Sequence, residues 1–197
     1  MYTLNDGQEL IKLARRSVQD TFSRTKTADD RLRERYKVKQ GTFVTLNKHD
    51  DLRGCIGFVL PYKSLYEAVI HCAKAAAFED PRFPPVRQDE LKDITIDVSI
   101  LTVPHEIKVD ERDELLERIK IGRDGLIIRK GMYSGLLLPQ VFVEYNANPK
   151  KALEMLCQKA GLATDAWRSP DAVIESFQAQ VFKETAPNGE IVEEKLG

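Results

Sequence analysis

The segment Leu52–Gly57 holds the residues whose types and spacing best suit chemistry, because Arg53 and Cys55 stand two positions apart beside glycines. Alternate side chains of a strand share a face, so Arg53 and Cys55 should be neighbours. Glycine packs poorly in a strand, and Gly54 and Gly57 therefore indicate a bulge or a point where something approaches the backbone closely. We predict Cys55 and Arg53 as catalytic residues, with Gly54 and Gly57 beside a bound substrate.

The chemistry expected of Cys55 is nucleophilic attack by its thiolate. An ordinary cysteine is only about 3 % thiolate at pH 7, so a nearby cation is needed to lower its pKa. Arg53 is the cation predicted for this role. The alternative is that Cys55 is a small buried hydrophobe and Arg53 a surface charge. The other two cysteines, Cys72 and Cys157, fall on apolar helical stripes and are predicted to be core residues.

A nucleophilic cysteine is usually paired with a base. The sequence offers three histidines, His49, His71 and His105, and carboxylates such as Asp80 and Asp97. None of these groups can be placed beside Cys55 from spacing alone, so the identity of the base stays open at this point.

Two further segments supply candidate substrate-binding residues. Asp80 and Arg82 lie at the start of a loop stiffened by three prolines, where charged groups can be held ready for a ligand, although a local salt bridge between them is the alternative. Gln140 follows Pro139 inside an apolar run, 136–143, which we predict to be a strand with an edge or bulge at that point. Asp80, Arg82 and Gln140 are predicted to orient a substrate.

The elements that must position these residues follow from periodicity and capping signals. Helical stripes predict three main helices, and β-branched and aromatic runs predict several strands, without strict strand–helix alternation. The fold class predicted is therefore α+β, with a mixed, mainly antiparallel sheet flanked by helices. The predicted elements, in order, are a helix over 10–22 capped by Asn5 and Asp6, a β-hairpin of 42–46 and 52–58, a helix begun by a capping box at Ser64 and Glu67, a strand over 94–100, a short helix over 110–119, strands at 126–128 and 136–143, a helix from Asn148 and Pro149 to a left-handed cap at Gly161, a strand over 174–183, and a polar tail.

Composition excludes several classes of function. The chain has 197 residues with 30 Lys and Arg against 31 Asp and Glu, a net charge of −1, so no overall field draws in nucleic acid or an anionic membrane. Three cysteines are an odd number with no paired spacing, which favours a reducing cytoplasm over a secreted disulfide scaffold. No apolar run is long enough to span a membrane, and no metal, nucleotide or dinucleotide motif is present, so no metal or cofactor is predicted.

Several segments together resemble the AMMECR domain family. The resemblance spans nearly the whole chain in order, and only 23–40 and the acidic tail look individual. The segments that carry it are G-T-F-V-T-L at 41–46, L-R-G-C-I-G at 52–57, the pattern A-A-x-x-D-P-R-F-P-P-V at 76–86, D-V-S-I-L at 97–101, D-G-L-I-I at 124–128, G-L-L-L-P-Q-V at 135–141, K-A-G-L at 159–162, Trp167, and 177–184.

The resemblance implies one AMMECR domain over 1–197, with a larger lobe that holds both termini and a smaller lobe, which we expect within about 104–135. It also implies that L-R-G-C-I-G is the signature, with a cleft site nearby, and that the biochemical activity is not established. Some relatives look linked to Memo-like and radical-SAM proteins, which implies partners in a modification pathway.

Two functions remain open on the sequence. In the first, the protein is a small enzyme that uses the Cys55 thiolate, activated by Arg53. In the second, it is a non-catalytic binding or adaptor domain that presents RNA or a protein to a partner enzyme. The near-neutral charge argues against strong nonspecific binding of nucleic acid, without excluding a structured RNA target.

Overall fold

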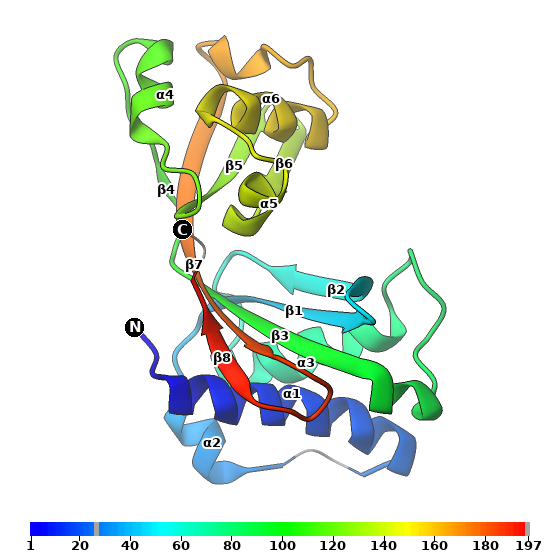
Figure 1. The fold of residues 1–197 in the computed structure, drawn as a ribbon. Helices are drawn as coiled ribbons and strands as arrows, with labels where there is room; N and C mark the ends of the chain where they lie inside the picture. Colours follow the sequence, from blue (N-terminus) through cyan, green and yellow to red (C-terminus); the bar gives the residue numbers. More distant parts are fainter. Residues whose placement is uncertain (26–27, 196–197) are drawn as a thin grey trace. The chain divides into compact units, whose positions relative to one another are not determined.

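The computed structural model describes residues 1–25 and 28–195, and the chain divides into two compact units. Unit 1 comprises Met1–Val103 and Gln180–Glu194, and unit 2 comprises Pro104–Ala179 together with Lys195. Helices and antiparallel strand pairs occur in both units, so the fold is α+β, as predicted (Figure 1). Within the described ranges, no helix is both long enough and apolar enough to cross a bilayer.

The sheet of unit 1 positions the Leu52–Gly57 segment at its edge. Its strands run in the order β2-β1-β3-β7, and β8 also pairs with β7 (Figure 1). The predicted hairpin of β1 and β2 is present, and its two turn residues, His49 and Asp50, both have positive φ, as in a type I′ turn. The strands are β1 (Gly41–Lys48), β2 (Asp51–Phe58), β3 (Ile94–Leu101), β7 (Val173–Glu184), whose first half lies in unit 2, and β8 (Ile191–Glu194).

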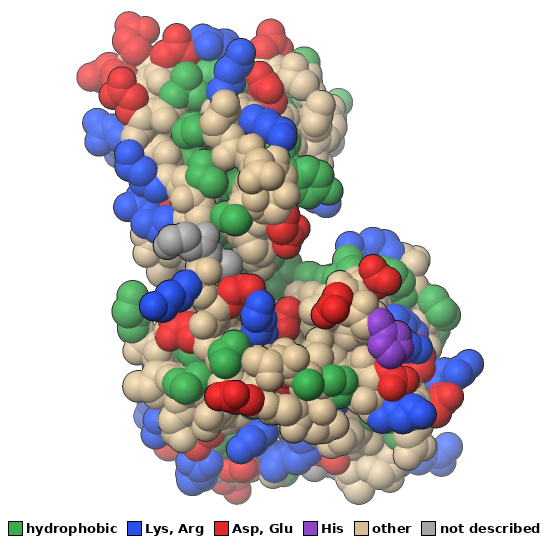
Figure 2. Space-filling view, in the orientation of Figure 1, with side chains coloured by type: hydrophobic (Ala, Val, Ile, Leu, Met, Phe, Trp, Pro, Cys, Tyr) green, Lys and Arg blue, Asp and Glu red, His purple; other side chains and the backbone are tan. Residues whose placement is uncertain are grey.

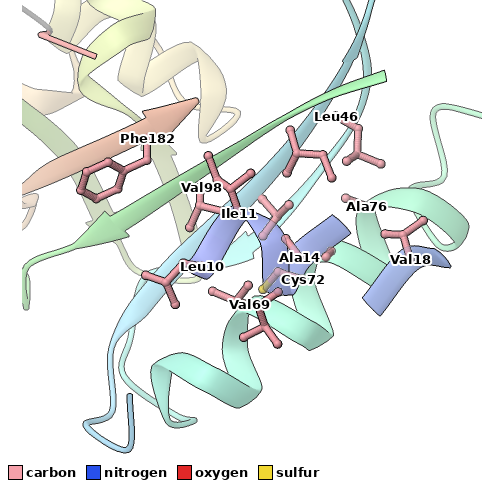
Figure 3. Close-up of a cluster of buried hydrophobic side chains, with 14 of the residues drawn as sticks. Leu10, Ile11, Ala14, Val18, Leu46, Val69, Cys72, Ala76, Val98 and Phe182 are labelled. Carbon is pink, nitrogen blue, oxygen red and sulfur yellow. The ribbon is translucent and has the colours of Figure 1, made fainter. Parts of the chain in front are cut away.

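One face of this sheet carries the core of unit 1. Helices α1 (Leu4–Ser23) and α3 (Leu65–Phe78) pack on it and bury an apolar cluster. Cys72 of α3 is fully buried within this cluster (Figure 3). The predicted cap at Ser64 begins α3: the Ser64 hydroxyl accepts a hydrogen bond from the Glu67 N–H and donates one to the Glu67 carboxylate. The remaining helices of the unit are α2 (Asp30–Arg35) and the 3₁₀ helix η1 (Gln88–Asp93).

Unit 2 has its own sheet and core. Its strands run in the order β6-β5-β7, and β4 also pairs with β7. Trp167 and Cys157 lie in its core, so the core position predicted for Cys157 is confirmed. Its elements besides β7 are β4 (His105–Glu106), η2 (Arg112–Glu114), α4 (Leu115–Arg118), β5 (Asp124–Lys130), β6 (Tyr133–Leu137), α5 (Pro139–Glu144), α6 (Pro149–Lys159) and η3 (Ala166–Arg168).

Three predictions about these elements are wrong. The predicted strand over 136–143 ends at Leu137, because Pro139 begins α5 at a position where its missing N–H and fixed φ suit a helix start. The first helix is capped by Thr3 in a reciprocal capping box with Asp6, so Asn5 lies inside the helix. The predicted polar tail contains β8, which pairs with β7.

Candidate functional site

Cys55 lies at the end of a row of three side chains that crosses three strands. The register pairs Thr45 of β1 with Cys55 of β2 on one side and with Asp97 of β3 on the other. The alternate residues Val44 and Leu46 point into the core, so the row lies on the opposite face, where its members are half-buried. We call this face, defined by Thr45, Cys55 and Asp97, the polar face of unit 1.

A bulge in β2 sets this register. Leu46 pairs with Gly54 whereas the next residue, Asn47, pairs with Leu52, so Arg53 is an extra residue without a partner across the strands. The bulge anticipated from the glycines is therefore present. One consequence was not anticipated: Leu52, which alternation would turn inward, is 41 % exposed.

The backbone of Cys55 is held by a pair of side chains from the loop after α3. Its N–H donates to Asp80 Oδ2 at 2.9 Å, and Arg82 Nη2 donates to its carbonyl oxygen at 3.2 Å. Asp80 and Arg82 are themselves joined, with Nη2 and Oδ2 2.7 Å apart. Because β2 is the edge of the sheet, the two side chains occupy the place that a further strand would take. We call this arrangement the edge clamp.

The edge clamp explains why Thr45 approaches the sulfur. Since the N–H and C=O of Cys55 point outward to the clamp, Cys55 and Thr45 are a non-hydrogen-bonded pair, in which cross-strand side chains come closest. The hydroxyl of Thr45 donates to Cys55 Sγ at 3.2 Å. Within the row, the thiol thus has a hydroxyl as its immediate polar neighbour.

Electrostatics at the thiol keep it protonated. Burial raises the pKa of Cys55, and the negative charges of Asp80 and Asp97 raise it further. The hydrogen bond from Thr45 and the positive charge of Arg82 lower this pKa, but the net shift is upward from the ordinary value. At neutral pH the thiol is therefore in its neutral form.

Asp97 is the titratable group of the row whose pKa lies nearest neutrality. Burial raises the pKa of this carboxyl to about 6, and the negative charges of Glu194 and Glu184 act in the same direction. A hydrogen bond from Asn47 Nδ2 to Asp97 Oδ2, at 3.0 Å, and the positive charge of Lys183 oppose the shift. Such a carboxyl can take up or release a proton close to pH 7.

Arg53 contacts a different set of residues. The bulge directs its side chain to Glu90 of η1, with Nη2 and Oε2 3.1 Å apart, and to the ring of Phe83. This pair is largely buried, with side chains 11 % and 12 % exposed, and it lowers the pKa of Glu90 to about 2. Arg53 Nη1 is buried and has no hydrogen-bond partner within 1–25 and 28–195. The arginine that acts on the pKa of Cys55 is Arg82.

Packing inside unit 1 accounts for both glycines of the signature. A Cβ at Gly54 would lie 2.1 Å from the carbonyl oxygen of Ala76, because α3 passes directly over β2 at this point. A Cβ at Gly57 would lie 2.3 Å from the ring of Phe43. The close approach predicted here is thus an approach of the protein to itself, and a part for Gly54 and Gly57 in substrate binding stays a prediction.

The other candidates lie away from the row or in unit 2. His49 is exposed in the hairpin turn and His71 is exposed on α3, whereas His105 belongs to β4 of unit 2 and contacts Ser176. Gln140 lies in α5 of unit 2, where its Oε1 is buried without a hydrogen-bond partner in the described part of the chain. Its predicted part in orienting a substrate also stays a prediction.

Thr45 is the functional candidate that the sequence reasoning missed. A two-residue turn at His49 and Asp50 with regular pairing would place Thr45 opposite Gly54, and only the extra residue Arg53 moves it opposite Cys55. The signal that could have found it was the glycine-flanked bulge taken together with the turn length. No cluster of three or more metal-ligating side chains occurs in the described ranges.

Comparison with known proteins identifies the family of this chain and several similar chains. A sequence profile of the AMMECR1 family matches residues 11–182. The Methanocaldococcus jannaschii protein MJ0810 is 46 % identical over 198 residues, covering 100 % of this chain and 98 % of its own length. The Methanopyrus kandleri protein MK0488 is also 46 % identical, over 98 % of this chain and 96 % of its own length.

A solved structure has the same fold. The crystal structure of the uncharacterised protein PH0010 from Pyrococcus horikoshii superposes with a TM-score of 0.91 at 40 % sequence identity. It covers 97 % of this chain and 97 % of its own length. The names of these similar proteins state no activity, so the function must be argued from the site.

Proposed function

The chain belongs to the AMMECR1 family, and from that premise we propose that it is a small enzyme in which the thiol of Cys55 attacks a substrate bound on the polar face of unit 1. Asp97 is the base in this proposal. The observation that carries it is the row Cys55–Thr45–Asp97, which puts a carboxyl with a pKa of about 6 in the same row as a neutral thiol.

The charges of the row favour a thiol that loses its proton during the reaction over a thiol that is already ionised before the substrate binds. At pH 7 a carboxyl with a pKa of about 6 is mostly ionised, yet it accepts a proton more readily than an ordinary aspartate. The raised pKa of Cys55 means that a nucleophilic thiolate arises only when a base removes its proton. In the proposed transfer the Thr45 hydroxyl, which donates to Sγ in the structure, turns to accept the proton of the thiol and passes its own proton to Asp97, its neighbour in the row.

The remaining predicted residues take distinct parts. Asp80 and Arg82 hold the backbone of Cys55 through the edge clamp, and Arg82 takes over the electrostatic role first predicted for Arg53. Arg53 keeps a proposed part in binding an anionic group of the substrate, which would compete with its largely buried ion pair with Glu90. Gln140 remains a candidate for orienting the substrate.

A non-catalytic binding or adaptor domain is the second candidate. The neutral state of the Cys55 thiol favours this candidate. A recognition surface needs no thiolate, whereas an enzyme with a preformed thiolate nucleophile needs a lowered thiol pKa. Memo-like and radical-SAM proteins are the partners proposed from the family resemblance. A protein target suits the face better than RNA, because Asp97 and Glu194 lie there or close by, and basic and acidic side chains are interspersed on the visible surface of each unit (Figure 2).

Alkylation of Cys55 in the Asp97→Asn variant tests the enzyme proposal, because the two possible roles of Asp97 predict opposite changes in the alkylation rate. If Asp97 is a base, its loss slows alkylation by iodoacetamide at pH 7. If Asp97 only contributes negative charge, its loss lowers the pKa of Cys55 and speeds alkylation. Mass spectrometry follows the reaction, with the fully buried Cys72 and Cys157 as internal controls.

The Cys55→Ser variant separates the two functions once a partner or substrate is in hand. Loss of activity with partner binding retained supports the enzyme. Faster alkylation in Asp97→Asn, or no alkylation of Cys55 beyond that of Cys72, would contradict the enzyme and leave the binding domain as the better proposal.

A further inference from the structure

Unit 2 contains a pocket of about 540 Å³ that is independent of the polar face of unit 1. A pocket of this size is in the range that holds small ligands. Its walls come from three separate segments of unit 2: the turn of the β5–β6 hairpin, Leu162 three residues after the end of α6, and the loop before β7. The residues that line it are Lys130, Gly131, Met132, Tyr133, Leu162 and Asp171.

The apolar wall of the pocket is unusually exposed for side chains of its kind. Met132 stands at the tip of the hairpin and is fully exposed, and the side chain of its neighbour Tyr133 is more than half exposed. Leu162 is brought to the same place because Gly161, with φ of 73°, ends α6 and turns the chain. A thioether and an aromatic ring side by side suit contact with an apolar ring or with a cation.

The polar end of the pocket presents an exposed carboxylate. Lys130 Nζ donates to Ser169 Oγ at 2.8 Å and also contacts Asp171 Oδ1, to which Ser169 donates as well. These two hydrogen bonds lower the pKa of Asp171 to about 2, so the carboxylate is ionised at neutral pH. Both use Oδ1, and a hydrogen bond from the backbone N–H of Asp171 itself lowers the pKa in the same direction.

The exposure of the two charged groups decides which ligand charge is accepted. The side chain of Asp171 is 65 % exposed, whereas that of Lys130 is 26 % exposed and already has two partners. A ligand that approaches from solvent therefore meets the carboxylate oxygen before the ammonium group. A cationic head group would form a charge-assisted hydrogen bond with this carboxylate, whereas an anionic head group would find only the less exposed Lys130 as a partner.

We propose that this pocket binds a small molecule with an aromatic body and a primary ammonium group, with the ring against Met132 and Tyr133 and the ammonium on the exposed carboxylate of Asp171. The proposal does not depend on the chemistry at Cys55. It assigns unit 2 a ligand site of its own, since all six lining residues belong to that unit.

A charge series on one ring tests the proposal with the full chain, labelled with ¹⁵N and observed by NMR. The probes are phenethylamine, 2-phenylethanol and 3-phenylpropionate, which differ mainly in the head group. We expect amide shifts at Met132, Tyr133, Leu162 and Asp171, with phenethylamine binding about five- to tenfold more tightly than the alcohol and the carboxylate more weakly still.

Matched variants show whether Asp171 is responsible for the preference for a positively charged head group. Asp171→Asn should remove the preference for the amine over the alcohol, while Asp165→Asn, the same change at an exposed position outside the pocket, should leave it intact. Equal binding of amine and carboxylate to the wild-type chain would overturn the proposal without any variant. So would the absence of shifts at these residues, or an unchanged preference in Asp171→Asn.

Discussion

The carboxylate of Asp80 accepts a hydrogen bond from the backbone N–H of Cys55, with Oδ2 2.9 Å from the nitrogen. Arg82 donates to the carbonyl oxygen of the same residue. The two side chains therefore satisfy the backbone hydrogen-bonding groups of Cys55, which lie at the edge of the sheet and would otherwise face solvent or another chain. The charged pair of the proline-stiffened loop is thus neither an isolated surface salt bridge nor a contact to the thiol itself. It contacts Cys55 through the backbone and acts on the pKa of the thiol through its charges, and both effects can be measured.

The edge clamp should contribute to stability. Asp80→Ala removes the acceptor for the Cys55 N–H and leaves Arg82 without its partner, so we expect a loss of about 1–3 kcal/mol in the free energy of unfolding. Arg87→Ala, which breaks an exposed pair with Asp89, should leave the free energy of unfolding close to the wild-type value. Urea denaturation of both variants checks the contrast, and equal losses would show that the clamp is not special.

Asp97 should make the protein less stable as pH rises. Its pKa is raised from 3.8 to about 6 in the folded state, so between those values the folded chain holds a proton that the unfolded chain has lost. Stability conferred by Asp97 therefore falls with rising pH through this window and is lost above about pH 6. Asp97→Asn should raise the free energy of unfolding at pH 7 by roughly 1–3 kcal/mol and flatten its change between pH 4 and 6.

The control for this prediction is Asp51→Asn, the same change at an exposed residue of β2. Urea denaturation at several pH values gives the measurement. A variant at Asp97 that is less stable than the wild type at pH 7 would mean that the charged carboxylate is stabilised in the fold, contrary to the expected shift.

The hydroxyl of Thr45 should control how fast Cys55 reacts. Its hydrogen bond to Sγ lowers the pKa of the thiol, so Thr45→Val, which keeps the shape and removes the hydroxyl, should raise that pKa and slow alkylation. Loss of one hydrogen bond corresponds to a slowing of about two- to tenfold. Thr45→Ser retains the hydroxyl and should react at close to the wild-type rate. If Thr45→Val and Thr45→Ser are alkylated equally fast, the hydroxyl has no part in the reaction.

Gly54 should tolerate no side chain. A Cβ there would overlap the backbone oxygen of Ala76, which cannot move without shifting α3. We expect Gly54→Ala to lower the free energy of unfolding by about 3 kcal/mol or to abolish folding. Gly189→Ala, whose Cβ would meet its nearest atom at 3.0 Å, is the matched change at a looser site. Thermal unfolding of the two variants gives the comparison, and similar melting temperatures would contradict the packing argument.

Several parts of this protein follow from local sequence. Ser64 with Glu67 begins α3, Pro149 after Asn148 begins α6, and Gly161 ends it, because capping and backbone conformation are decided within one or two turns of chain. The hairpin and the apolar helical stripes follow in the same way, and they place Cys72 and Cys157 in cores. The sequence therefore determined the fold class and most elements, together with the segment that holds Cys55.

The site itself was decided by tertiary structure. A single extra residue, Arg53, shifts the register by one, and this shift places Thr45 opposite Cys55 and sends Arg53 to Glu90. The row reaches Asp97 only because β3, some fifty residues after β1 in the sequence, pairs with β1. Register between distant strands and the burial that raises the pKa of Asp97 depend on the sum of many packing contacts, which no local pattern records. For that reason the sequence alone predicted Cys55 and offered Asp97 as one of several possible bases. The pairing of Thr45 with both residues is visible only in the folded chain.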